Sequence, residues 1–296
     1  MELNKKILHI GLLLIGVSLI FTITFASVYK LENPVFLKMF VEKSIYPNED
    51  STSLEIFELK YITNISDNRK IANIEFKENQ DIEVTVSDDS FDYQGMPFFN
   101  DISNNQRENK YGIYVVNTIY FNMNLKNIDR KLNEIKLNNV KITFNDGSTL
   151  ETNLGKIILY EDKNKNKDRE FVSSSASSDN EFSSTIKLKN NIKLLKVDTP
   201  LLHDTKDYFD LSIDNIDYKD ISGKKYEKGA MLSSHSKFKI TNSILKKYSY
   251  YEIQPKLYYK DNNANESYMF IDNIHYNPNN FDFMGIFQYL RLRGVD

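Results

Sequence analysis

Residues 7–28 form an uninterrupted apolar run near the start of the chain. Its 22 positions contain no Asp, Glu, Lys or Arg. As an α-helix they would extend about 33 Å, which is close to the thickness of the hydrocarbon core of a bilayer. The run therefore predicts a membrane-spanning helix, with the membrane as the first partner of the protein.

A cleaved secretory signal is the main alternative to this anchor. Such a signal has an apolar core of about 7–15 residues, followed by small residues before the cleavage point. Thr24 and Ala26 could occupy such a site, and cleavage after Ala26 would make the protein a secreted one. The length of the run favours an uncleaved signal-anchor.

The orientation of the helix in the membrane is predicted from the lengths of the segments before and after it. Lysines lie on both sides of the run, so the distribution of basic residues does not determine which end of the helix is cytoplasmic. Long domains, however, cross the membrane largely regardless of charge. We expect a single-pass protein of the cell membrane, with residues 1–6 as a short cytoplasmic tail, residues 7–28 as the anchor and an extracytoplasmic body.

Beyond residue 50 the dominant pattern is alternation of apolar and polar residues, which is typical of antiparallel strands with one face on a core. In segment 111–125 one parity carries Tyr111, Ile113, Val115, Ile119, Phe121, Met123 and Leu125. Segment 141–161 predicts a hairpin, because Asn145, Asp146 and Gly147 tolerate the positive φ angles of tight turns. A similar pattern at 256–278 predicts a second hairpin. We expect a mainly β fold, in which the N-terminal transmembrane helix is followed by two antiparallel β-sandwich-like domains.

Changes in composition suggest the boundaries of these domains. Residues 29–49 read as a membrane-proximal stalk, and Asn33 followed by Pro34 predicts a short helix within it. Residues 163–180 are charged and then Ser-rich, which indicates a polar linker. The predicted β domains are therefore residues 50–162 and 181–296.

The motifs of the common enzyme classes are missing from the sequence. The chain contains no Cys, which removes thiolate metal sites and Cys nucleophiles, and it has no dinucleotide fingerprint, nucleophile elbow or HExxH pattern. We therefore expect no catalytic residue, no cofactor and no metal. A net charge of −3 argues against nucleic acid as a partner. The alternative is an envelope hydrolase that uses carboxylates in segment 203–220, such as Asp204, Asp207 and Asp210, since paired carboxylates can perform acid–base chemistry.

The remaining candidates are surface groups that could contact a partner. We expect four tyrosines to face outward and three lysines to share one strand face: Tyr114, Tyr120, Tyr250, Tyr258, Lys187, Lys189 and Lys193. Tyrosines can stack on sugars or proteins, and lysines can meet an anionic polymer. An anchored, Cys-free and Asn/Lys-rich β protein resembles, in composition only, envelope proteins of AT-rich bacteria. The sequence therefore predicts a non-enzymatic binding or structural module of the cell envelope, whose partner is an envelope polymer or a membrane protein.

Overall fold

The computed structural model describes residues 2–45, 54–87, 109–125, 134–161, 168–239, 243–271 and 273–295. Strands make up 51% of the protein and helices 18%, so the fold is mainly β, with an N-terminal apolar helix and several antiparallel sheets. The helices are α1 (Glu2–Val28), α2 (Pro200–Thr205), α3 (Ile244–Lys247) and α4 (Phe283–Leu292).

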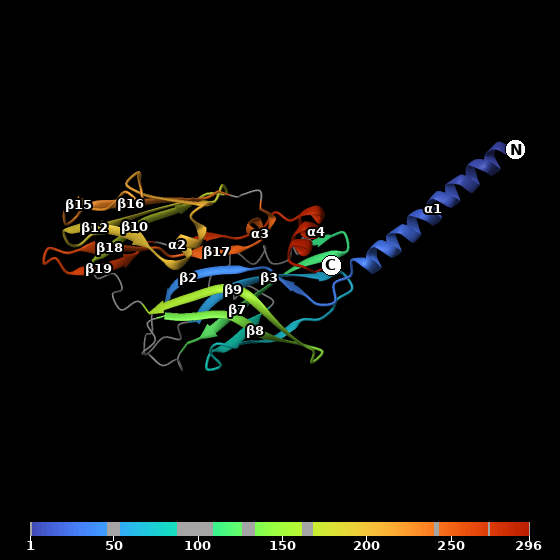
Figure 1. Ribbon diagram of the computed structural model, residues 1–296, viewed down its shortest axis with the longest axis horizontal. Coiled ribbons are helices and arrows are strands. Elements are labelled where there is room, and N and C mark those ends of the chain that lie inside the picture. The colour runs from blue at the N-terminus through green and yellow to red at the C-terminus, as the bar shows by residue number, and fades with distance from the viewer. Residues whose placement is uncertain are drawn as a thin grey trace, which may run out of the picture.

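Helix α1 projects from the β body, and the C-terminal end of the chain lies close to the point where α1 joins that body (Figure 1). Within α1, residues Lys5–Val28 have a mean hydropathy of 2.3, and their most apolar part is not buried against the protein. The helix is thus long and apolar enough to cross a membrane, as the sequence predicts. The apolar side chains that it exposes would be solvated by lipid.

The strands of the described residues form four sheets, which we call A to D. Sheet A contains β1 (Val35–Phe36), β3 (Leu54–Asn64), β7 (Tyr114–Asn124), β5 (Glu83–Ser87) and β6 (Lys110–Tyr111). Sheet B has the order β20 (Ile274–Tyr276), β17 (Tyr250–Ile253), β2 (Met39–Ile45), β9 (Thr149–Glu161), β8 (Glu134–Phe144) and β4 (Ile71–Phe76). Sheet C has the order β10 (Arg169–Ala176), β11 (Glu181–Leu188), β16 (Met231–Phe238), β13 (Phe209–Ile213) and β14 (Ile216–Asp217). Sheet D has the order β15 (Lys225–Tyr226), β12 (Ile192–Asp198), β18 (Lys256–Lys260) and β19 (Glu266–Phe270).

The described residues form four hydrophobic clusters, of which a small one lies around Tyr160 and Phe270 and three larger cores hold the sheets together. The first joins sheet A to sheet B, with the rings of Phe57 and Phe121 stacked at 5.2 Å between centroids. The second joins sheets C and D to α2 and to strands β17 and β20 of sheet B. The third lies beneath α4, where Tyr289 meets residues of sheet A such as Ile62. This third core brings the C-terminal helix to the base of α1.

Both predicted hairpins are confirmed. Strands β8 and β9 pair antiparallel, and Gly147 in the turn between them has a φ of +83°. Strands β18 and β19 form the second hairpin, with Lys256 opposite Phe270.

The predicted stalk helix is wrong, because this segment forms the strands β1 (Val35–Phe36) and β2 (Met39–Ile45). β2 is parallel to both β9 and β17, so sheet B is mixed where antiparallel pairing was expected. Met39 and Val41 are buried on one face of β2, and Glu42 is buried on the opposite face. A strand covered on both faces has no two-residue alternation, and its apolar run can be mistaken for a helical stripe.

Part of the predicted linker is also strand. Residues Arg169–Ala176 form β10, which pairs with β11 at the edge of sheet C; residues 163–167 lie outside the described ranges. Sheet B contains strands from both predicted β domains, and β2 of the predicted stalk lies between them, paired with β9 of the first and with β17 of the second. The division into domains at 162 and 181 stays a prediction.

The alternation in β7 changes parity within the strand. Ile119, Phe121 and Met123 are buried as expected, but nearer the start of the strand Tyr114 and Val116 are buried instead. The odd-numbered face covers the core between sheets A and B, whereas Tyr114 and Val116 belong to the core beneath α4. One strand therefore serves two cores on opposite faces.

Candidate functional site

The three candidate lysines are exposed, but they do not share one strand. Lys187 lies on β11 in sheet C, and Lys193 lies on β12 in sheet D. The chain bends at Asn190 between the two strands. The expectation of a single lysine face is therefore wrong, because the bend at the asparagines moves the chain from one sheet to another.

Lys193 belongs instead to a row of lysines that runs across sheet D. It stands opposite Lys225 of β15 on one side and opposite Lys260 of β18 on the other. Residues opposite each other in an antiparallel pair lie on the same face, about 5 Å apart. Lys193 points away from the core, since its neighbours Ile192 and Leu194 are buried. We call Lys193, Lys225 and Lys260 the distal lysine row, because sheet D lies at the end of the body away from α1 (Figure 1).

The surroundings of the distal lysine row are mixed in charge. Lys260 forms an ion pair of 3.2 Å with Glu266 on β19. The amide of Lys228 donates to Asn191 Oδ1 over 2.7 Å, which places a further lysine and Glu227 beside the row. Like charges that face each other across strands are unfavourable. An anionic ligand would relieve that repulsion.

Tyr120 and Tyr250 both lie near the carboxylate of Glu58 on β3, which belongs to a polar network. Tyr120 stands opposite Glu58, and both tyrosines are half-buried. Burial, together with the negative charge of Glu58, raises the pKa of Tyr120. Burial and the carboxylate of Glu252 raise the pKa of Tyr250, whose hydroxyl donates to Glu252 over 3.2 Å.

Asn277 completes this network. Its Nδ2 donates to Glu58 Oε2 over 2.7 Å, and its Oδ1 accepts from Lys60 Nζ over 2.6 Å. Lys60 is also ion-paired with Glu58. The two tyrosines are therefore partly committed to contacts inside the protein, and less of each ring is free for a partner than the sequence suggests.

Tyr258 lies beside a second group of aromatic and charged residues. Its ring is 5.8 Å from that of Tyr268, and Lys196 Nζ lies 5.1 Å from its centroid. On the same strand, Lys256 Nζ lies 3.3 Å from the centroid of Tyr160. Burial lowers the pKa of Lys256.

A buried carboxylate that sequence reasoning missed adjoins this group. Glu42 on β2 is fully buried, and it accepts hydrogen bonds from Tyr160 Oη and from the Leu201 amide, each 3.0 Å long. Burial raises the pKa of Glu42 to about 7, despite these donors and the nearby charge of Lys256. The sequence feature that could have indicated this site is the acidic residue directly after the apolar residues MFV in the segment MFVEKSI.

Tyr114 is not an outward-facing residue, which corrects the sequence prediction. It is buried, and its hydroxyl donates to the carbonyl of Tyr29 over 2.9 Å. It therefore helps to hold the segment that follows α1. The change of parity within β7 explains why alternation placed it on the wrong face.

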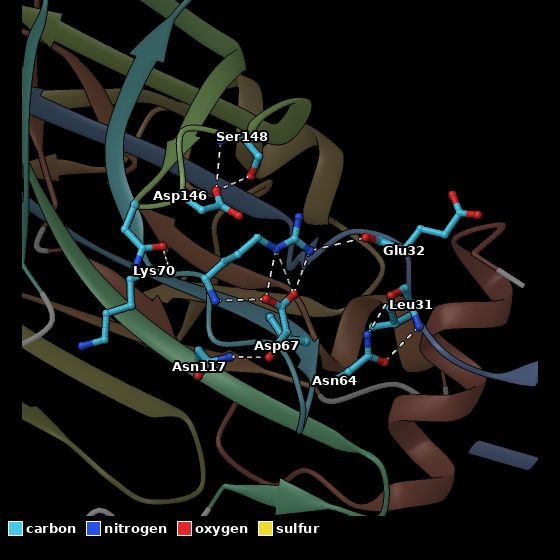
Figure 2. Close-up of polar contacts among 11 residues, drawn as sticks. Leu31, Glu32, Asn64, Asp67, Lys70, Asn117, Asp146 and Ser148 are labelled. Carbon is cyan, nitrogen blue, oxygen red and sulfur yellow. Dashed lines mark hydrogen bonds and ion pairs between the residues drawn. The ribbon is translucent and has the colours of Figure 1, made fainter. Parts of the chain in front are cut away.

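Two further contacts fix the same segment, as Figure 2 shows. Asn64 Nδ2 donates to the Leu31 carbonyl over 2.7 Å, and Asn64 Oδ1 accepts from the Leu31 amide over 2.9 Å. Arg69 donates to the Glu32 carbonyl over 3.3 Å, while Asp67 holds the guanidinium with hydrogen bonds of 2.8 and 3.0 Å. The chain that leaves α1 is thus bound directly to the β body.

The carboxylates of segment 203–220 take different partners. Asp204 pairs with Lys156 at 2.8 Å, Asp210 pairs with Lys239 at 2.5 Å, and Asp214 accepts from the Ser233 amide at 2.8 Å. Among the described residues, no group of three or more His, Asp, Glu or Cys side chains could hold a metal ion.

Comparison with known proteins adds little to this description. No protein-family model and no curated protein matches the sequence. The chain has a weak likeness to the E. coli chaperone DraB, at 9% identity and a TM-score of 0.21, over 83% of this chain and 97% of the other. Fibronectin(III)-like modules of Clostridium thermocellum CbhA match at 8% identity and a TM-score of 0.16, over 83% and 91%. Cadherin-like domains 1 to 4 of zebrafish RET match at 8% identity and a TM-score of 0.20, over 82% and 51%. Scores this low carry no argument about function.

Proposed function

We propose that the protein is a membrane-anchored, extracytoplasmic and non-enzymatic binding module of the cell envelope. In this proposal α1 is the anchor and two β-sandwich-like domains, residues 50–162 and 181–296, form the body. The ligand is an envelope polymer that carries repeated anionic groups. The single observation that carries the binding role is the register of Lys193 with Lys225 and Lys260.

The position of the distal lysine row supports this ligand. Adjacent strands are about 5 Å apart, so three lysines on neighbouring strands span roughly 10 Å. That spacing suits successive phosphate or carboxylate groups of one chain. The row also lies at the end of the body away from α1, where it would be presented to a polymer outside the membrane (Figure 1). Exposed charge contacts are screened by salt, so binding should weaken as ionic strength rises.

Retention on isolated cell-wall material tests the binding role. The full chain in detergent should be retained at low salt and released at high salt. The variant K193Q/K225Q/K260Q should be retained roughly ten-fold less, since three exposed contacts of about 0.5 kcal/mol each give that factor. The control variant K141Q/K206Q/K219Q removes the same charge from exposed lysines elsewhere and should behave like the wild type. Equal loss of retention in both variants would refute the assignment to the distal lysine row.

Protease added to intact cells tests the location. If the body is extracytoplasmic, it should be digested and leave a small membrane-bound fragment. Complete protection, under conditions that cleave a known surface protein, would contradict the proposed topology.

A further inference from the structure

Helix α4 exposes an apolar face that the protein itself does not cover. Its inner face, with Ile286, Tyr289 and Leu290, is buried in the third core. On the outer face Met284 and Leu292 are 59% and 61% exposed. The outer positions follow the helical spacing of three and four residues: Met284, Phe287, Gln288, Arg291 and Leu292. An outer face with large apolar residues and a basic residue is typical of a helix that lies in a membrane interface.

The position of α4 identifies a lipid surface as the occupant of this face. Phe287 lies 6.4 Å from Phe25 and 4.9 Å from Tyr29, and Phe283 lies 6.1 Å from Phe25, all between ring centroids. Phe25 is three residues before the end of α1, which corresponds to about 4.5 Å along the helix axis. The aromatic residues of α4 therefore lie level with the last turn of the membrane-spanning segment, where aromatic side chains gather at membrane interfaces.

The segment between α1 and the body holds this arrangement in place. Tyr114, Asn64 and Arg69 bind the backbone of Tyr29, Leu31 and Glu32 in succession. Figure 2 shows the contacts to Leu31 and Glu32. A segment bound at three successive points differs from a flexible stalk, because bending it would break these contacts. When α1 spans the bilayer, α4 is consequently held against the membrane surface.

A cavity of about 330 Å³ lies between α4 and the segment that leaves α1. Its basic lining residues are Lys30, Arg291 and Arg293, and its acidic one is Glu32. Arg293 donates to the Phe36 carbonyl over 3.0 Å and to Tyr289 Oη over 2.7 Å, so it is fixed in place. Lys30 and Arg291 are exposed at this level. The net positive charge of the lining suits the phosphate of a lipid headgroup.

We propose that α4 is an interfacial helix, which inserts Met284 and Leu292 among the lipids beside Phe287, while Lys30 and Arg291 contact a phospholipid phosphate. This inference rests on the anchoring role of α1 in the proposed function, but it requires neither the polymer ligand nor a particular orientation. It adds a second attachment of the body to the membrane, beside α1. The body would then stand on the bilayer in one fixed pose.

The chain contains no Trp, so a single introduced Trp reports its own depth. We would reconstitute the full chain into vesicles whose phospholipids carry bromine on the acyl chains near the headgroup, which quench nearby Trp fluorescence. The variant M284W should lose fluorescence by about two-fold, because an interfacial helix buries its apolar face several ångströms below the headgroups. The variant M231W is the matched control, since Met231 is 52% exposed on β16, away from α1 (Figure 1), and it should not be quenched.

A third variant separates this inference from the anchoring role. F21W places the reporter at an exposed position of α1, about two turns before the end of the helix, and should be quenched if α1 spans the bilayer. Quenching of F21W without quenching of M284W would overturn the proposal for α4 and leave the anchor intact. If neither is quenched, the anchor itself fails, and the proposal for α4 fails with it.

The phosphate contact has its own measurement. Native mass spectrometry of the purified full chain should detect a retained phospholipid, and K30Q/R291Q should retain at least several-fold less of it. The control K141Q/K206Q should retain as much as the wild type, and added inorganic phosphate should not displace the lipid. Equal retention by K30Q/R291Q, or displacement by free phosphate, would overturn the headgroup site.

Discussion

Tyr160 donates a hydrogen bond of 3.0 Å to Glu42 in the interior of the protein, and this bond joins two neighbouring parallel strands. The other oxygen of Glu42 accepts from the Leu201 amide in α2. One carboxylate thereby links strands of sheet B to the helix that leads into the second core. A buried carboxylate is unfavourable when it is ionised, so this link is sensitive to pH.

The stability of the fold should therefore fall as pH rises from about 4.5 to about 7. The pKa of Glu42 is raised from 4.5 to about 7, so the folded state binds the proton more tightly than the unfolded state. The stabilisation is fully present below the unfolded pKa and is lost as pH rises through the folded pKa. The difference amounts to roughly 3 kcal/mol. Urea unfolding of the full chain in detergent at pH 5 and pH 8 measures it.

The variant E42Q removes this titrating group and should flatten that pH dependence. The variant E75Q, at an exposed position on β4, is the control and should leave it unchanged. If the difference in unfolding free energy between the wild type and E42Q is the same at pH 5 and at pH 8, the expected effect is contradicted.

The variant N64A should destabilise the protein by about 1–3 kcal/mol, because it leaves a buried amide and a carbonyl of Leu31 without their partners. Thermal unfolding of the full chain in detergent would show the loss. N263A changes an exposed turn residue and should shift stability by less than about 0.5 kcal/mol. Similar shifts in the two variants would mean that Asn64 does not hold the segment after α1.

The variant G155A should destabilise by about 3 kcal/mol, because Gly155 has a φ of +123° and an added Cβ would meet the Met39 carbonyl of β2 at 2.1 Å. G147A is the matched control. Its φ is +83°, but the space around it is open, so only the backbone strain of about 1 kcal/mol remains. Chemical unfolding of both variants compares them, and a G155A no less stable than G147A would argue against the close approach of β2 and β9.

A specific protease site inserted between Ser178 and Asp179, in the exposed turn after β10, should allow cutting without separation of the two parts. Pairing of β10 with β11 and of β2 with β17 crosses the cut. The two fragments should co-elute in size-exclusion chromatography and separate only in denaturant. Separation under native conditions would mean that the predicted domains, 50–162 and 181–296, are independent.

Some elements could be predicted because their cause is local. The apolar run of residues 7–28 can bury itself only in lipid or in a large core, and it forms the exposed helix α1. The turn at Asn145–Gly147 requires residues that tolerate positive φ, and the sequence supplies them there. Lys193 could be recognised as an exposed lysine from the alternation around it. Its neighbours Lys225 and Lys260 could not, since the register of three separate strands brings them together.

Other features depend on contacts between distant parts of the chain. Residues 35–45 have a pattern that fits a helix as well as a strand covered on both faces, and only pairing with β9 and β17 selects the strand. Tyr114 is buried because α4 and the segment after α1 cover one end of β7. The buried position of Glu42 has the same origin, since the polar partners come from β9 and α2.

The sequence by itself thus determined the long apolar helix, the mainly β character and the two hairpins, because each depends on hydrophobicity or backbone preference within a short window. The tertiary structure alone decided which faces are covered, which lysines form a row and that α4 returns to the base of α1. The backbone hydrogen bonds between strands depend little on which side chains the strands carry. The choice of partner is therefore made by the packing of whole sheets, which no short window contains.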